Sequence, residues 1–399
     1  MRPSSMFRMS WLAIGLALLA SCSKDKVVEV KVGNTADFMR DSEMVEVPVE
    51  PLLSYLGSEY VYVTDSLLNE IPSQVTYDGK LIFQTETFPG TESNYYVYPS
   101  ATPHTYDSVT MGRVYPERAD DIAWENELVG FRAYGPGTQN KGEKAFGYDI
   151  FFKYPSAEPV LERLYAPETN PATWQKVDSL RAIDSELADE FIKTFSYHID
   201  HGLGMDCYAV GATLGAGVAA IERNDTIQYP WCYESAEVLD NGPLRFSVRL
   251  DFAPVDIEGA GNVIEHRLIT LDAGSHLNKC KVWYDGLNSS QTIVTGFPRR
   301  DESQAVMDST TYTLAYADPT QGPDNGKALL GIVLNQPVKE MLESDGHVIA
   351  RSEIAPRDTF SYSWGFAWDK TDVKTLAKWE EYLTKYSLKQ NIPLSVTYK

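Results

Sequence analysis

The stretch from Tyr197 to Ala220 gathers side chains that can carry protons, in a chain that has only six histidines. These side chains are Tyr197, His198, His201, Asp206 and Tyr208. Histidine titrates near neutral pH and an aspartate can fix its tautomer, so the set predicts general acid–base catalysis, with the tyrosines as further proton carriers. Five glycines among them let the backbone bend or approach a ligand closely. The stretch therefore predicts one wall of an active site.

Two other interpretations of this stretch stay open. His198, His201 and Asp206 are residue types that bind divalent ions, but their spacing of three and five residues matches no specific metal site. The histidines could instead be hydrogen-bonded at the edge of a sheet, with no role in chemistry. We favour proton transfer, and the sequence implies neither a metal nor a cofactor.

A substrate also needs groups that hold it, and the chain offers arginines and aromatic rings. Arginine binds carboxylates through two parallel hydrogen bonds, and a flat aromatic face can stack on a sugar ring. The arginines considered are Arg113, Arg118, Arg132, Arg299 and Arg300. Arg132 stands out because it emerges from an apolar strand, where an unpaired arginine is costly. A purely structural pairing with Asp149 or Glu125 is the alternative.

The predicted substrate-binding residues come from several separate segments. They are Trp124, Glu125, Arg132, Trp231, Glu234 and His276. The two tryptophans would supply stacking faces. Glu125 and Asp206 are also candidates for the two carboxylates that a glycoside hydrolase requires. By strand alternation, His276 shares a face with Asn278 and Cys280.

The first 22 residues predict a secretion signal with a lipid anchor. Arg2 and Arg8 give a basic start, and the apolar run from Trp11 to Ala20 is too short to span a bilayer. Small residues directly before Cys22 are typical of bacterial lipoproteins, in which that cysteine is lipidated. We therefore expect an outer-membrane lipoprotein that faces the periplasm or the cell exterior.

The charge of the chain limits its partners. The formal net charge is -21, and loss of Arg2 and Arg8 with the signal makes it -23. Such an acidic chain argues against nucleic acid and against binding to an anionic membrane surface. The sequence also has no P-loop, dinucleotide fingerprint, GxSxG elbow or HExxH motif. We expect an acidic or neutral oligosaccharide as ligand and a glycan uptake complex as a further partner.

Hydrophobic periodicity predicts a mainly β fold, a large antiparallel β-sandwich with a few peripheral helices. Alternating segments recur regularly from Leu244 onward, and Asp272–Ser275 is a hairpin turn. A single strand is expected over Trp124–Tyr134. Helices are expected over Pro171–Phe195 and over Asp372–Leu388 with Asp372 as its cap, each packed against a sheet. The predicted division is a signal (residues 1–22), an N-terminal β unit (23–110) and the sandwich domain (111–399).

Three motifs carry a resemblance to a known family: WENELVGFRAYGP, YHIDHGLGMDCYAVGATLGAG and HRLITLDAGSHLNK. With them the chain resembles the bacterial lipoprotein family called domain of unknown function 4861, over almost all of its length after the signal. The resemblance implies a galactose-mutarotase-like β-supersandwich and a place among genes for polysaccharide breakdown, often of pectin-like or other uronic-acid glycans. It implies no catalytic residues. One departure is that the family pattern leads us to expect WEND followed by an arginine, whereas this chain has Glu127 and Leu128 after the WEN motif.

These observations lead to one favoured function and two alternatives. The favoured function is a carbohydrate-active enzyme of the lyase, epimerase or isomerase type, acting on uronic-acid-containing oligosaccharides such as pectin fragments. A cation such as Arg132 would neutralise the carboxylate, and His198 or His201 would take the neighbouring proton. The alternatives are a non-catalytic carbohydrate-binding lipoprotein of a glycan uptake system and a structural accessory of such a complex.

Overall fold

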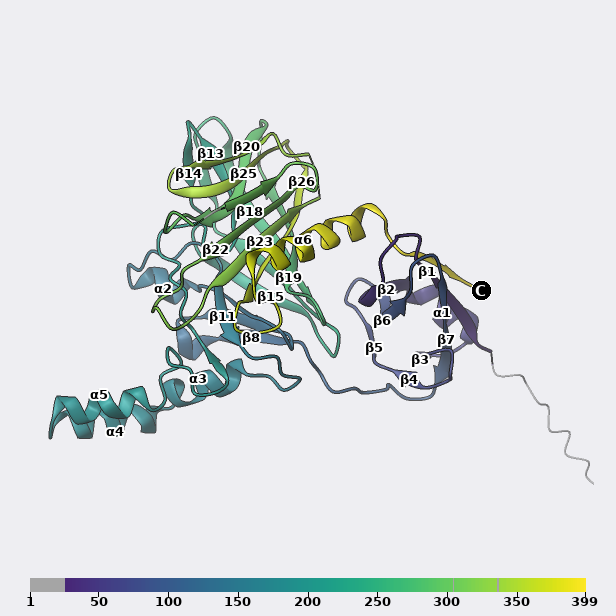
Figure 1. Ribbon diagram of the computed structural model, residues 1–399, viewed down its shortest axis with the longest axis horizontal. Helices are drawn as coiled ribbons and strands as arrows, with labels where there is room; N and C mark the ends of the chain where they lie inside the picture. Colours follow the sequence, from purple (N-terminus) through teal and green to yellow (C-terminus); the bar gives the residue numbers. More distant parts are fainter. Residues whose placement is uncertain (1–25, 304, 336) are drawn as a thin grey trace, which may run out of the picture.

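The computed structural model describes residues 26–303, 305–335 and 337–399 (Figure 1). It is mainly β, with large antiparallel sheets and six α-helices in the described part of the chain, and this confirms the predicted fold class. The predicted lipidation site, Cys22, lies outside the described residues. Within the described residues, every helix falls short of the length and apolar character that crossing a membrane would need.

One large sheet forms the first layer of the sandwich. Its strands, in spatial order, are β15 (Tyr233–Asn241), β16 (Arg245–Phe252), β18 (Gly261–Asp272), β19 (Leu277–Asp285), β26 (Thr359–Trp368), β23 (Ala328–Leu334), β22 (Thr313–Asp318) and β21 (Ala305–Asp308). The short β17 (Val255–Ile257) also pairs with β18. The predicted turn at Asp272–Ser275 joins β18 to β19 as a hairpin.

Two five-stranded sheets form the second layer. One consists of β12 (Gly204–Met205), β11 (Asp149–Lys153), β10 (Gly130–Ala133), β9 (Asp121–Glu125) and β8 (Met111–Tyr115). The other consists of β14 (Thr226–Gln228), β13 (Ala219–Arg223), β20 (Gln291–Pro298), β25 (His347–Ile354) and β24 (Glu340–Ser344). Residues of all three sheets enclose one hydrophobic core, so both smaller sheets pack on the same face of the large one.

Strand β26 shows how alternation builds this core. Phe360, Tyr362, Trp364 and Phe366 point into the space between the layers, whereas Ala367 faces the opposite side. The Trp364 ring stacks on Tyr148, with centroids 4.0 Å apart. Burial of each such side chain contributes about 1.5–3 kcal/mol before the cost of ordering the chain.

Helix α6 (Leu376–Asn391) covers the outer face of the large sheet, as predicted (Figure 1). Trp379 and Leu383 pack over β22 and β23. Gly331 of β23 permits this contact, because a Cβ there would lie 2.7 Å from Leu383 and 2.8 Å from Trp379. The helix begins after Thr375, whose hydroxyl accepts from the Lys378 N–H, so Thr375 and not Asp372 is the cap.

The N-terminal strands enclose a separate core. One sheet has the order β27 (Ser395–Tyr398), β1 (Val28–Gly33), β7 (Glu92–Ser100), β3 (Tyr60–Thr64) and β4 (Glu70–Ile71). The other has the order β2 (Arg40–Pro48), β6 (Lys80–Thr87) and β5 (Ser73–Val75), and α1 (Val49–Leu56) packs beside it. The last strand of the chain thus returns to this unit, which lies beside the sandwich in Figure 1.

Two predicted elements differ from the structure. The single strand expected over Trp124–Tyr134 is a hairpin, β9 and β10, because Asn126 closes a turn by accepting the N–H groups of Leu128 and Val129. The helix expected over Pro171–Phe195 is two helices, α4 (Pro171–Arg181) and α5 (Ser185–Lys193), because Asp184 caps the second.

The α4–α5 pair also does not pack on a sheet. The two helices pack on each other and protrude from the sandwich (Figure 1), so that Trp174 is 39% exposed. The remaining helices are short: α2 (Pro136–Asn140), α3 (Leu161–Thr169) and the 3₁₀ turn η1 (Pro116–Arg118).

Candidate functional site

A cavity of about 400 Å³ opens where the β8–β12 sheet meets the stretch that follows α5. Four of the five predicted catalytic residues line it, together with the predicted carboxylate-binding arginine. These residues are Tyr197, His198, Asp206, Tyr208 and Arg132. We call this cavity the histidine pocket. The structure therefore brings most of the predicted proton-transfer set together with Arg132, which lies on the separate strand β10.

A glycine-bearing loop positions the two ends of this set. The backbone N–H of Asp206 donates to the Tyr197 carbonyl over 2.8 Å, which closes the loop between them. Gly204, in β12, has a φ of 113°, and a Cβ there would lie 1.9 Å from the carbonyl oxygen of Phe152. Only glycine allows the loop to pair so closely with β11. The loop thus holds His198 beside Asp206.

Arg132 lies at the centre of a buried polar cluster. Its Nε donates to Asp149 Oδ2 over 2.9 Å, and its Nη2 donates both to the same oxygen and to Asp206 Oδ2, the latter over 3.1 Å. The Tyr134 hydroxyl donates to Asp149 over 2.8 Å. Arg132 therefore has a structural partner, as the alternative interpretation expected, and this partner is Asp149. Two carboxylates share one guanidinium, so the cluster carries an excess negative charge.

This excess charge changes the acidity of Asp206. Burial, together with the nearby Asp149 carboxylate, raises the pKa of Asp206 to about 6, against the lowering influence of Arg132. Burial likewise raises the pKa of Tyr197, which keeps that phenol protonated at neutral pH. A carboxyl that titrates near pH 6 in a cavity is the kind of group that acid–base catalysis uses.

The raised pKa of Asp206 predicts a pH dependence of stability. Because the folded state binds the proton more tightly than the unfolded state, the stabilisation is complete below pH 4 and is lost as the pH rises through about 6. The loss amounts to up to about 3 kcal/mol. In the Asp206→Asn variant this loss is absent, so its stability relative to the unsubstituted protein should increase between pH 4 and pH 7. Urea unfolding across that range measures the difference; parallel profiles for the two proteins would contradict it.

His198 has one ring nitrogen bound and the other free. Its Nδ1 lies 2.9 Å from the backbone carbonyl oxygen of Asp206, which can only accept, so Nδ1 carries the proton. In the neutral ring Nε2 is then the proton acceptor, and it has no partner among the described residues. The side chain is 55% exposed and its Nδ1 lies 3.9 Å from the Asp206 carboxylate. This geometry leaves Nε2 able to accept a proton.

Arg118, at the end of η1, supplies a second cation to the pocket. Its guanidinium stacks on the rings of Tyr165 and Tyr197 at 4.7 and 4.6 Å. Its Nη1 forms an ion pair with Glu168 at 3.8 Å, but Arg118 donates no side-chain hydrogen bond among the described residues. It thus has free donors, whereas those of Arg132 are largely occupied. The sequence does not distinguish Arg118 from the other four candidate arginines, because the two tyrosines that hold it lie far along the chain.

Three predicted site residues do not join the histidine pocket. His201 is exposed and does not line the cavity, and Glu234 is exposed on β15. Trp231 lines a different cavity. In the described part of the chain no three His, Cys, Asp or Glu side chains gather as metal ligands.

The structure corrects the assignment of three further residues, which lie in the interior. Trp124 is fully buried and donates to Asn278 over 2.8 Å. His276 is enclosed under α6, where its ring nitrogens are occupied by the Phe366 carbonyl and by Asp372. Neither side chain can reach a ligand in the histidine pocket.

Glu125 is the third corrected residue. It accepts from the Lys153 ammonium over 2.6 Å and from the backbone N–H groups of Val160 and Leu161, at the start of α3. These contacts stabilise the helix terminus and fix the carboxylate in the interior. The pair of Glu125 and Asp206 therefore cannot act as the two carboxylates of a glycoside hydrolase.

Comparison with solved structures shows which proteins have a similar fold. The chain is similar to an alpha-mannosidase from Enterococcus faecalis V583, with 9% identity and a TM-score of 0.49 over 94% of this chain and 46% of that one. It is also similar to a protein in the Glycosyl Hydrolase Family 38 from Enterococcus faecalis, with 10% identity and a TM-score of 0.53 over 94% and 47%. The chain spans about half the length of these proteins, and at such identities the likeness concerns the fold alone.

Comparison of sequences identifies the family. The chain belongs to the family described as domain of unknown function (DUF4861), whose sequence model matches residues 32–396. This confirms the resemblance carried by the three motifs. A relative of nearly equal extent is Uncharacterized protein P7 of Formosa agariphila, which is 25% identical over 413 residues that cover 98% of each chain.

Proposed function

We propose that the protein is a cell-envelope lipoprotein of polysaccharide breakdown that acts on uronic-acid-containing oligosaccharides, such as pectin fragments. The reaction is transfer of the proton on the carbon beside the carboxylate, as in lyases and in those epimerases and isomerases that act at this carbon. The observation that carries this proposal is the presence of His198, with a free ring nitrogen, and Arg118, with free donors, in one cavity. The similarity in fold to a protein in the Glycosyl Hydrolase Family 38 supports the choice of a carbohydrate substrate.

The residues of the pocket can divide the reaction between them. Arg118 binds the uronate carboxylate and makes the adjacent C–H bond more acidic. Nε2 of His198 accepts that proton, and the Asp206 carboxylate stabilises the imidazolium that forms. In a lyase the electron pair left on carbon forms a C=C bond as the bond to the glycosidic oxygen breaks, and Tyr197 protonates that oxygen. In an epimerase Tyr197 returns a proton to the opposite face of the carbon.

The alternative is a carbohydrate-binding lipoprotein of a glycan uptake system without catalysis. The Arg118 guanidinium and the tyrosine faces beside it would serve binding equally well. With either function we propose that the protein is lipid-anchored to the outer membrane, on its periplasmic or cell-surface face.

Turnover separates the two functions. The chain from Ser23 onward is incubated with a panel of acidic oligosaccharides, and products are followed by ultraviolet absorbance of unsaturated uronates and by chromatography. We expect turnover of at least one member of the panel. Measurable binding without turnover of any member would overturn the enzyme and leave the binding protein.

Replacement of Arg118 by glutamine tests the carboxylate contact. Loss of a charged hydrogen bond in a partly enclosed site should lower kcat/KM on the uronate about 10- to 100-fold. The methyl ester of the same substrate is the matched control, since it has no carboxylate to bind, and its kcat/KM should change little. An equal loss on both substrates would show that Arg118 does not bind the carboxylate.

A further inference from the structure

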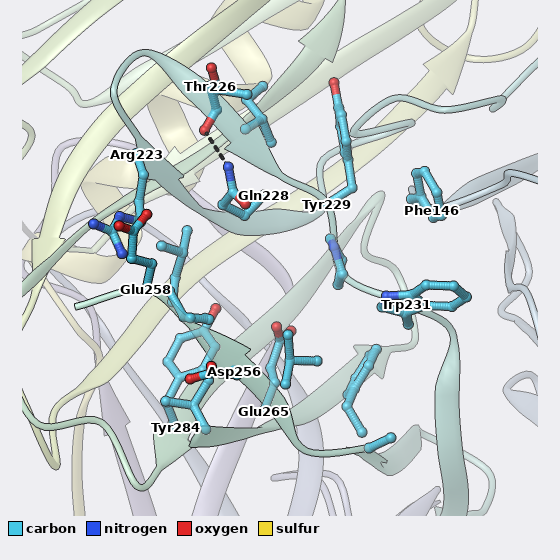
Figure 2. A pocket seen from close by; sticks show the side chains of 18 of the residues that line it. Phe146, Arg223, Thr226, Gln228, Tyr229, Trp231, Asp256, Glu258, Glu265 and Tyr284 are labelled. Carbon is cyan, nitrogen blue, oxygen red and sulfur yellow. Dashed lines mark hydrogen bonds between the residues drawn. The ribbon is translucent and has the colours of Figure 1, made fainter. Parts of the chain in front are cut away.

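A second and larger cavity, of about 720 Å³, lies at another edge of the sandwich (Figure 2). Its walls come from β13 and β14 on one side and from β16, β17 and β18 of the large sheet on the other. The segment that leads from β14 to β15 closes one end and carries Trp231. We call this cavity the tryptophan pocket.

Aromatic rings form one wall of the tryptophan pocket. Trp231 is 61% exposed, which is unusual for so large an apolar surface in a folded protein. Beside it the rings of Phe146 and Tyr229 stack at 5.5 Å with an interplanar angle of 19°. Flat rings held open to solvent in a concave site fit the apolar face of a pyranose ring.

Polar groups without partners lie on the other walls. Tyr284 is only 5% exposed, and its buried hydroxyl makes no well-formed hydrogen bond among the described residues, although the Glu265 carboxylate lies near it. Arg223 has a buried Nη1 that likewise lacks a partner, and no ion pair involves it in the part of the chain described. Buried donors left unpaired cost free energy, and hydroxyl groups of a ligand would satisfy them.

The charged side chains that line the tryptophan pocket favour neutral over acidic sugars. Asp256, Glu258 and Glu265 line the cavity together with a single cation, Arg223, and Glu265 is paired with Arg267. The remaining balance is negative, because Asp256 and Glu258 are exposed carboxylates that outnumber the unpaired Arg223. A uronate would be repelled, whereas the hydroxyl groups of a neutral sugar can donate to these oxygens.

We propose that the tryptophan pocket binds neutral pyranose units of an oligosaccharide, with Trp231 as the stacking platform and Arg223 and Tyr284 as hydrogen-bonding groups. The pocket is separate from the histidine pocket, but both flank the segment from 136 to 147. Lys141 and Glu143 line the histidine pocket and Phe146 lines the tryptophan pocket. A glycan with both neutral and acidic units could use both cavities, although binding in the tryptophan pocket does not depend on catalysis in the other.

Calorimetric titration of the chain from Ser23 onward tests this proposal. The probes are the neutral tetrasaccharides of β-1,4-linked glucose, mannose and galactose, with tetragalacturonate as the acidic counterpart. We expect saturable binding of at least one neutral probe. We also expect the Trp231→Ala variant to lose about tenfold or more in affinity, because truncation of a central aromatic contact is costly.

The controls make each outcome informative. Trp174→Ala removes another exposed tryptophan, on the protruding α4–α5 pair, and should leave binding unchanged. His198→Ala should also leave neutral-sugar binding unchanged, which distinguishes this site from the proposed catalytic one. Arg223→Gln provides a second, independent loss of affinity. Binding of no neutral probe, binding insensitive to both Trp231→Ala and Arg223→Gln, or dependence of only tetragalacturonate on Trp231 would overturn the proposal.

Discussion

Replacement of His198 by alanine should lower turnover of the proposed uronate substrate about 10²- to 10⁴-fold, the usual contribution of a general base, which is the role we propose for this side chain. Its Nε2 is the ring nitrogen that can accept the proton, because Nδ1 is bound to the Asp206 carbonyl. The thermal midpoint should change little, since the side chain is half exposed and makes only this one hydrogen bond through its ring in the described structure. Steady-state rates and thermal unfolding of the same preparation measure both effects.

His201→Ala is the matched control for that result. His201 lies three residues further along the same loop but is exposed and does not line the histidine pocket. His201→Ala should change turnover less than twofold, because substitutions of exposed residues usually have small effects. Equal losses for the two variants, or a large loss for His201→Ala alone, would reassign the base.

Replacement of Arg132 by methionine should destabilise the protein by about 3–5 kcal/mol, because it leaves Asp149 and Asp206 buried without their shared cation. Urea unfolding at pH 7 measures the loss. The loss should be smaller at pH 5, where Asp206, with its pKa of about 6, is largely protonated and needs no counter-ion. Addition of Asp206→Asn to the variant should restore part of the stability for the same reason.

Arg113→Met is the comparison for that experiment. Arg113 also forms ion pairs, with Glu117 and Glu162, but all three side chains are substantially exposed. Exposed pairs of this kind contribute about 0–1 kcal/mol. A loss for Arg132→Met no larger than that for Arg113→Met would show that the buried cluster does not stabilise the fold.

The strands of the sandwich could be predicted because their signals are local. Alternation along Thr359–Trp368 reports directly which side chains enter the core, and the Asp272–Ser275 turn carries its own residues. The turn at Asn126 cannot be recognised from the sequence, because the apolar residues that follow it continue a strand-like pattern. Its amide also donates to the carbonyls of Asp272 and Ser275, which a sequence pattern does not reveal.

The prediction of a single helix over Pro171–Phe195 was wrong because one capping residue divides it. Asp184 begins a new helix by accepting the Glu186 N–H, although the apolar stripe of Pro171–Phe195 runs on across it. The apolar residues of this stripe pack between α4 and α5 instead of against a sheet. Periodicity identifies an apolar face but not the partner that covers it.

The gathering of the histidine pocket could be predicted, but the role of its arginines could not. Residue types pointed to Tyr197, His198 and Asp206 in one loop with Arg132 as the cation, and Arg132 of β10 does line the same cavity. The sequence left open whether Asp149 accepts the hydrogen bonds of Arg132. Because it does, Arg118 is the arginine of this pocket whose donors are free to bind a ligand. Such assignments depend on pairings between distant strands, where the polar partners of a buried charge decide its role.

The measurement that tests the central claim most directly follows the proton on the carbon beside the carboxylate. An acidic oligosaccharide deuterated at that carbon is incubated with the protein, and nuclear magnetic resonance follows the label. A lyase, an epimerase or an isomerase that uses His198 as base should release deuterium to solvent, and the His198→Ala variant should not. Conversion of the substrate with the label fully retained, or release of the label at the same rate by the variant, would contradict the proposed chemistry.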